Sequence, residues 1–260
     1  MKKFFYLMAF VCTLGMFTAC SSDDDDPVAV RNEKIEGTWN VEVTDMPDEG
    51  LYTGSVKINW QVPEGTTLNV DLTGTGQAFP MDLNTVVIPL ANNLANTYLP
   101  QVLKSVEFTK DGKINAIYAE VSDDDTEAVD ASTTTWKKAE GYATYKVVNE
   151  SLINVTINAD KATESIEDAE EKAQIKAILQ KYNSIPVNIR WNGEKPYFFV
   201  DKAFVQPMIA NLVAMISNVP TDDMDEDDLA SFNMLKGIVN QLPDIMDKTT
   251  TFEAGLELTK

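Results

Sequence analysis

Carboxylates are the side chains with reactive chemistry that this sequence offers in quantity. Its 260 residues include 41 Asp and Glu, no His, and two Cys, Cys12 and Cys20. Without His the chain lacks the commonest general base, the commonest zinc ligand and the usual partner of a Ser or Cys nucleophile. Acidic side chains alone can bind a cation or act as a pair in glycoside hydrolysis.

The acidic run at 221–228 is the first candidate for a cation site. A calcium loop of the EF-hand type beginning at Asp223 would have Asp228 where position 6 requires Gly, and Met234 where position 12 requires Glu. The run therefore predicts the acidic start of a helix, where negative side chains are favoured. A weak, irregular calcium site is the alternative. The run at 123–125 is interpreted in the same way, and we expect no metal and no cofactor.

The sequence contains no local motif that is typical of a catalytic site. No Gly-x-Ser-x-Gly elbow is present, and Gly74-Thr75-Gly76 lacks the following Lys of a phosphate-binding loop. Two carboxylates could hydrolyse a glycosidic bond, but no stretch singles out one pair among so many acids. We therefore expect a protein that is not an enzyme and name no catalytic residue.

The N-terminus has the order of a secretory signal. Lys2 and Lys3 precede an apolar run at 4–17, and the small residues Thr18 and Ala19 precede Cys20. The run is too short to span a bilayer, which takes about 20 apolar residues. We predict a lipoprotein signal peptide at 1–19.

The residues around Cys20 make this prediction more specific. Phe17-Thr18-Ala19-Cys20 resembles the lipobox of bacterial lipoproteins, which implies cleavage before Cys20 and acylation of its thiol and new amino group. The acidic run after it resembles the export signal of Bacteroidetes surface lipoproteins, which implies an outer-membrane position facing the cell exterior. The residues of that candidate export signal are Ser21, Ser22, Asp23, Asp24, Asp25 and Asp26.

Charge restricts the partners of the rest of the chain. Loss of Lys2 and Lys3 with the signal takes the formal net charge from −20 to −22. Such a surface repels nucleic acid and anionic lipid, so the expected membrane contact is the lipid anchor alone. We expect a lipidated acidic tether at 20–33, followed by a single globular β-rich domain at 34–260 without disulfides.

Most of this domain alternates apolar and polar residues, which is typical of strands with one buried face. Asp111-Gly112 and Asn192-Gly193 are turn sequences typical of β-hairpins. Pro63-Glu64-Gly65 predicts a turn that joins 55–60 and 68–72 as a hairpin. Alternation favours antiparallel pairing, and a curled sheet would hide its edges. The sequence thus predicts a mainly β (α+β) fold, an antiparallel barrel or a strongly curved sheet with three to four inserted helices. The predicted strands are 37–44, 55–60, 68–72, 105–109, 114–121, 133–138, 142–148, 152–157, 185–191, 197–201 and 249–258, and the predicted helices are 83–98, 160–182, 204–216 and 229–242, the last ended by Pro243.

Gly37-Thr38-Trp39 at the start of the first strand resembles the Gly-x-Trp motif of lipocalin-like (calycin) barrels. In those barrels the Trp packs near a basic residue from the end of the barrel, and the candidates here are Lys248 and Lys260. The whole chain resembles an uncharacterised Bacteroidetes surface lipoprotein family with such barrels.

Three functional hypotheses follow. The first is a non-catalytic, lipid-anchored cell-surface protein that binds a small apolar ligand, a glycan or a host protein. The second is an envelope or adhesion protein that acts through protein–protein contacts. The third is a carboxylate-based glycoside hydrolase. A cavity of several hundred Å³ would favour the first hypothesis, and a filled core with an exposed apolar surface would favour the second.

Overall fold

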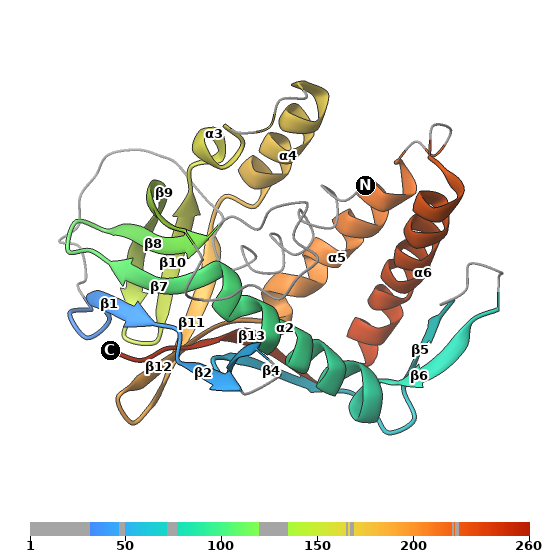
Figure 1. Cartoon of the computed structure of the whole chain (residues 1–260), viewed down its shortest axis with the longest axis horizontal. Helices are drawn as coiled ribbons and strands as arrows, with labels where there is room; N and C mark the ends of the chain where they lie inside the picture. Colours follow the sequence, from blue (N-terminus) through green and yellow to red (C-terminus); the bar gives the residue numbers. More distant parts are fainter. Residues whose placement is uncertain are drawn as a thin grey trace. The chain divides into compact units, whose positions relative to one another are not determined.

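The computed structural model shown in Figure 1 describes residues 32–46, 50–71, 77–119, 135–164, 166, 169–219, 221 and 224–260. They form two compact units. We call Ile58–Leu94 together with Asp201–Ala254 the helical unit. We call the described residues up to Lys57, together with Ala95–Val200 and Gly255–Lys260, the sheet unit.

A mainly antiparallel sheet of nine strands organises the fold, in the order β1-β7-β8-β9-β10-β11-β12-β13-β4. The last two strands in this order, β13 and β4, each run from one unit into the other. The bounds are β1 Gly37–Asn40, β7 Leu103–Phe108, β8 Lys113–Ala119, β9 Trp136–Asn149, β10 Leu152–Ile157, β11 Ile185–Asn192, β12 Lys195–Asp201, β13 Thr251–Glu257 and β4 Val56–Gln61. This confirms the predicted mainly β, antiparallel fold class.

Five α-helices and a π-helical turn complete the described residues, with two small hairpins. The hairpins pair β2 (Val43–Met46) with β3 (Gly50–Thr53), and β5 (Thr67–Val70) with β6 (Phe79–Asp82). The helices are η1 Leu83–Val87, α2 Ile88–Val102, α3 Ala159–Ala162, α4 Ala169–Lys181, α5 Lys202–Ser217 and α6 Glu226–Lys248. The predicted helix at 160–182 is therefore two helices, which accounts for one more helix than expected.

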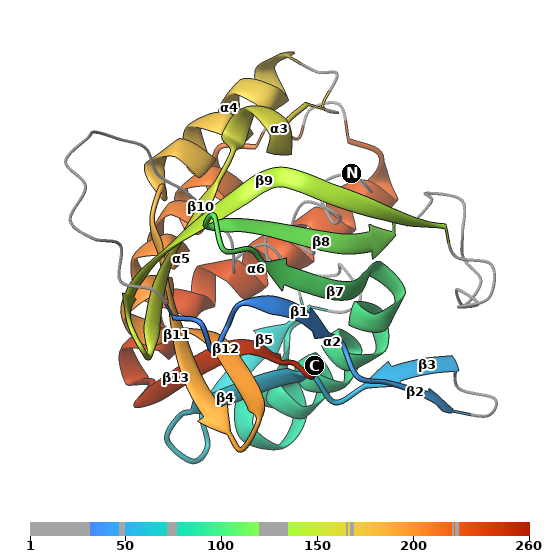
Figure 2. The same cartoon turned by 90° about the vertical axis from the view of Figure 1, so that its left-hand side faces the viewer.

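The strands of the sheet unit curl strongly round a common interior (Figure 2). Strands β7 and β12 are five places apart in the sheet order, which is about 24 Å in a flat sheet. Yet Phe108 of β7 and Phe198 of β12 stack with ring centroids 5.0 Å apart. Only a sheet bent back on itself brings these two rings together.

One β-bridge joins β1, the first strand in the sheet order, to the chain beyond β13. Asn40 at the end of β1 donates its N–H to the Thr259 carbonyl at 2.6 Å, and Thr259 donates to the Asn40 carbonyl at 3.0 Å. Strand β1 pairs with β7 on its other side. The bridge thus links β1 to the tail beyond β13, and the sheet is barrel-like as the sequence predicts.

Alternation along the strands decides which side chains fill the interior. On β10 the residues Ile153, Val155 and Ile157 are buried while their neighbours are half-buried. The predicted hairpin turns are confirmed, with Gly112 at φ +77° and Gly193 at φ +66°, values that favour glycine. These two turns set the registers of β7 with β8 and of β11 with β12.

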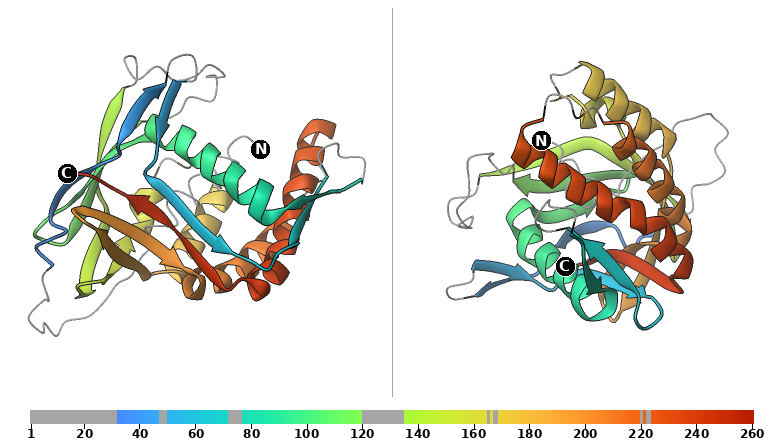
Figure 3. Two further views of the ribbon diagram at one scale, coloured as in Figure 1. Left: turned by 90° about the horizontal axis from the view of Figure 1, so that it is seen from below. Right: turned by 90° about the vertical axis from the view of Figure 1, so that its right-hand side faces the viewer.

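The helical unit has an apolar core of its own. Leu68 and Val70 of β5 are buried with Leu83 of η1 and Ile245 of α6. Helices α5 and α6 lie side by side (Figures 1 and 3). The unit therefore buries one face of its hairpin against helices.

Two local predictions in the helical unit are wrong. The pattern at 55–60 and 68–72 predicts a hairpin, but β5 pairs with β6. The reason is that β4 lies beside β13, where the Trp60 indole donates to the Thr249 hydroxyl at 2.8 Å and packs against Phe252.

Helix α6 also continues through Pro243 to Lys248. Proline inside a helix costs about 3 kcal/mol. Continuing the helix buries Ile245 and Met246, and burial of such a side chain contributes about 1.5–3 kcal/mol each, which offsets that cost.

Candidate functional site

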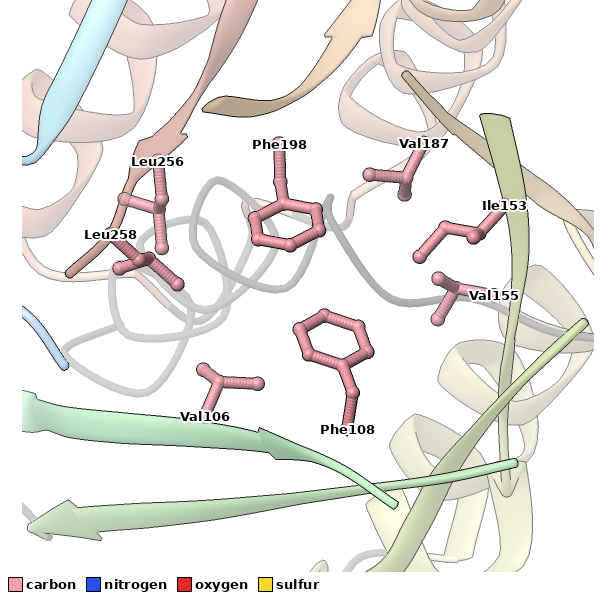
Figure 4. A pocket seen from close by; sticks show the side chains of 8 residues that line it. All are labelled: Val106, Phe108, Ile153, Val155, Val187, Phe198, Leu256 and Leu258. Carbon is pink, nitrogen blue, oxygen red and sulfur yellow. The ribbon is translucent and has the colours of Figure 1, made fainter. Parts of the chain in front are cut away.

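A cavity in the interior of the sheet unit is lined, among the described residues, by the apolar side chains shown in Figure 4. Phe108 and Phe198 face each other across it, and aliphatic side chains from β7, β10, β11 and β13 surround them. The lining residues are Val106, Phe108, Ile153, Val155, Val187, Phe198, Leu256 and Leu258. The cavity that remains between them is about 20 Å³. Sites for small molecules are about 300–1,000 Å³, so these side chains fill the space that a ligand would need.

Close contact between β12 and β13 contributes to this packing. A Cβ atom on Gly255 of β13 would lie 1.9 Å from the carbonyl oxygen of Phe198 and 2.6 Å from the Cα of Phe199. Both obstacles are backbone atoms, which no rotamer change can move aside. Only glycine fits at this position. Because glycine has no side chain, strand β12, which carries Phe198, can lie close to β13.

A cluster of aromatic rings and lysines lies where β1 meets the C-terminal tail. Trp39 is 1% exposed and donates its indole N–H to the Ile35 carbonyl at 2.6 Å. The Lys260 ammonium lies 4.7 Å from the centroid of the Trp39 ring. Trp191 packs edge-on against Trp39 at 5.9 Å, and Lys34 lies 3.7 Å from the Trp191 centroid. Lys260, and not Lys248, is therefore the basic residue beside the Gly-x-Trp tryptophan.

A different apolar surface runs along the outside of helix α2. Val86 of η1 and Leu90 and Leu94 of α2, which together we call the α2 stripe, are 40%, 47% and 46% exposed. Tyr98 continues the four-residue spacing on the same helix and is 61% exposed. Residues spaced by four lie on one face of a helix, so this apolar series faces solvent.

The opposite face of α2 and its N-terminus hold the helix in place. The Asp82 carboxylate caps η1 by accepting hydrogen bonds from the backbone N–H of Thr85 at 2.9 Å and from its hydroxyl at 3.0 Å, and these bonds lower the pKa of Asp82. In the sheet unit, Asn96 accepts from the Val56 N–H at 2.9 Å and donates to the Val56 carbonyl at 3.1 Å. Leu83 and Leu99 are buried.

The helical spacing of Leu83, Val87, Leu90, Leu94 and Tyr98 predicts a helix, and the helix is confirmed. The spacing identifies the helix but not a buried face, because only Leu83 of the five residues is buried. The sequence does mark this helix as unusual, although it does not show which side chains are exposed. From Leu83 to Leu103 it has no charged residue, while 24% of the whole chain is charged. A surface helix in so acidic a chain would ordinarily carry charges on its solvent face.

The acidic runs do not assemble a metal site in the part of the chain that the structure describes. Asp225 caps helix α6 and accepts a hydrogen bond from the Asp228 N–H at 2.8 Å, as expected for an acidic helix start. Among the described residues no three His, Cys, Asp or Glu lie close enough to hold a metal ion. Residues 222 and 223, the run at 123–125, Cys20 and the candidate export signal Ser21–Asp26 lie outside the described residues.

Among the described residues, shifted pKa values occur mainly at hairpin turns and strand surfaces. The exceptions include the Asp82 cap and Tyr182, whose pKa is raised by burial. Lys113 forms an ion pair with Asp111 in the β7–β8 turn, and its hydrogen bond lowers the pKa of Asp111 to about 2. Lys138 likewise lowers the pKa of Glu140 on β9. Because these groups are exposed and paired within their own strand or turn, they serve local structure.

Comparisons with protein families, with curated proteins and with solved structures find no match to this chain. Within the described residues, no helix combines the length and the apolar character needed to cross a membrane.

Proposed function

We propose that this protein is a non-catalytic, lipid-anchored cell-surface protein that acts through contacts of its outer surface with other proteins. The anchoring part of the proposal depends on Phe17-Thr18-Ala19-Cys20 and the acidic run after it. Acylation of Cys20 at more than one position would give a stable attachment, since a single acyl chain binds membranes only marginally.

The observation that carries the choice among the three hypotheses is the filled interior of the sheet unit. A cavity of about 20 Å³ has room for about one water molecule and none for a fatty acid, a sugar or an aromatic ring. A curled sheet of this kind has a solvent-facing surface on which a partner can bind, whereas its inner face is occupied by its own side chains.

The outer surface supports protein contacts more than it supports the other hypotheses. The α2 stripe places Val86, Leu90 and Leu94 in water on a chain with a net charge of −20. Exposed apolar groups gathered on one face mark interaction sites, because their removal from water is favourable. Glycoside hydrolysis would need two converging carboxylates in a cleft, and the residues that line the described cavity of the sheet unit include no carboxylate.

Binding of a small apolar ligand is the second candidate. Its support is the exclusively apolar lining of the cavity, together with the Trp39–Lys260 contact that resembles the lipocalin-like arrangement. A ligand could enter only if the rings of Phe108 and Phe198 separated, which would break their stacking at 5.0 Å.

Native mass spectrometry of the protein purified gently from its host distinguishes these two candidates. We expect the same mass, apart from covalent lipid, before and after denaturation. An additional mass that is lost on denaturation would overturn the proposal in favour of a carried ligand.

The anchor is tested separately by cell fractionation. The Cys20→Ala variant should leave the membrane fraction. If it remained membrane-bound, the lipid assignment would be wrong. Replacement of Asp23–Asp26 by Ala should reduce the accessibility of the protein to protease on intact cells, and unchanged accessibility would contradict the export signal.

A further inference from the structure

We propose that the α2 stripe is a self-association surface, on which the α2 helix of a second copy of this chain packs. The inference rests on the proposed function, since it names the protein partner of that outer surface. It commits to a second copy for reasons of charge, of self-complementary chemistry and of helix geometry.

Charge is the first argument. Two copies with a net charge of −20 each repel one another. Their association is therefore favoured where the contacting surfaces carry no charged side chains. Residues 83–103 form a run of 21 positions without Asp, Glu, Lys or Arg. Elsewhere about one residue in four is charged. Contact through α2 therefore keeps like charges out of the interface.

The chemistry of this run also suits contact between identical surfaces. In a two-fold dimer the same patch lies on both subunits and must complement itself. Charged groups fail this condition, because each would face a copy of its own sign. Aliphatic side chains satisfy it, and so do amide groups, which both donate and accept. The uncharged residues of α2 are mainly aliphatic, Asn and Thr.

Helix geometry is the third argument. Val86, Leu90 and Leu94 are spaced by four residues and form a ridge along the helix. Ridges of this spacing on two helices interdigitate at a crossing angle of about −50°, the commonest packing between helices in globular proteins. Two copies of α2 present identical ridges, so each ridge fits the groove beside the other. An anionic lipid surface is a poor alternative, since the run lacks the Lys and Arg that such surfaces attract.

The expected association is weak. Helix α2 has 15 residues and is about 22 Å long, so its face covers less than the roughly 800 Å² per partner of a standard interface. We therefore expect dimers where the protein is concentrated, as on a membrane, and monomers in dilute solution.

Cysteine cross-linking of the full chain in host membranes tests the inference. Leu94→Cys places a thiol on the α2 stripe, and Ala177→Cys places one on an exposed position of the charged helix α4 as the matched control. Under mild oxidation we expect disulfide-linked dimers of Leu94→Cys at least about five times as abundant as those of Ala177→Cys. Equal yields from the two variants would overturn the inference.

Charge substitution then separates self-association from random collision and from another partner. Leu90→Glu in the Leu94→Cys background should abolish cross-linking, because it opposes two carboxylates. Leu90→Lys alone should do the same, and co-expression of the Glu and Lys variants should restore the dimer. Cross-linking that Leu90→Glu leaves unchanged, or that co-expression fails to restore, would contradict a second copy as the partner.

The outcome is distinguishable from failure of the proposed function. A bare native mass with no stripe-dependent dimer would remove only the second copy as partner. A retained ligand with stripe-dependent dimers would remove the proposed function and leave self-association. Cross-linked dimers of the wild type would indicate a free Cys20 thiol and thereby contradict its acylation.

Discussion

Two apolar regions of this molecule differ in their exposure to solvent. Phe108 and Phe198 in the sheet unit are nearly buried and stack on each other, whereas Leu90 and Leu94 on helix α2 are almost half exposed. The residues that line the cavity alternate along β7 and β10, and those of the α2 stripe recur every four residues. Periodicity therefore identifies a face of an element but does not identify what covers it.

The two regions also differ in what their side chains contribute to stability. Interior side chains are surrounded on all sides, so their removal leaves a cavity as well as losing burial. Side chains of the α2 stripe lose little on truncation, because water already contacts them. A series of substitutions can therefore separate the two regions by magnitude.

The largest difference is expected between Phe198→Ala and Leu94→Ala. Removal of a buried Phe costs about 3–5 kcal/mol of unfolding free energy, while a surface substitution stays within about 0.5 kcal/mol. Urea unfolding of both variants measures the contrast. Equal losses would mean that the α2 stripe is covered in the folded protein.

Gly255→Ala should follow, with a loss of about 1–3 kcal/mol, because the new Cβ meets the backbone of Phe198 and Phe199. Gly237 of α6 provides the matched control, since nothing lies within 4 Å of a Cβ added there. Gly237→Ala should stabilise by up to about 1 kcal/mol, as for other Gly-to-Ala changes in helices. Opposite shifts in the thermal unfolding midpoints of the two variants would support the close approach of β12 and β13. An unchanged midpoint for Gly255→Ala would refute it.

Lys260→Met should lower the free energy of unfolding by about 0.5–1 kcal/mol, the usual contribution of an exposed cation–π contact. The substitution retains an apolar stem but removes the ammonium group above Trp39. Lys260→Arg keeps the positive charge and should restore most of the stability. If both variants behaved alike in denaturant unfolding, the charge would not contribute to holding the tail beside β1.

The smallest effect concerns acid stability in the β7–β8 turn. The pKa of Asp111 falls from 3.8 to about 2 in the folded chain because of Lys113. A carboxylate whose pKa is lower in the folded state stabilises that state at pH values above its unfolded pKa. This stabilisation is lost as the pH falls through the folded pKa. Asp111→Asn should therefore reduce the stability slightly at pH 5, and this difference should vanish towards pH 2. Unfolding midpoints at both pH values, in low salt, check this, and a pH-independent difference would exclude the ion pair as its cause.

Local signals account for most of the elements predicted correctly. Asp111-Gly112 and Asn192-Gly193 specify their turns through the backbone freedom of glycine, which needs no distant partner. The β10 alternation and the acidic start of α6 are similarly local. In contrast, the pairing of β5 with β6 depends on which strand β4 pairs with. The continuation of α6 through Pro243 depends on the residues against which Ile245 and Met246 pack.

The candidate site was harder to predict than the fold. The pattern at 83–98 identifies the helix, and the lack of charge from Leu83 to Leu103 is visible in the sequence. Neither observation says which side chains remain in water. Lys260 could be named beside Lys248 as a partner for Trp39, but the choice between them required the β-bridge of Asn40 with Thr259.

Composition and neighbouring residues suffice to predict the β-rich class, the turns, the strong negative charge and a lipid anchor at Cys20. In contrast, the filling of the interior by its own rings and the exposure of Leu90 and Leu94 on α2 are evident only in the folded chain. The physical reason is that burial depends on contacts between distant segments. Strand curvature brings Phe108 to Phe198 across 90 residues of chain, and no local pattern encodes that distance.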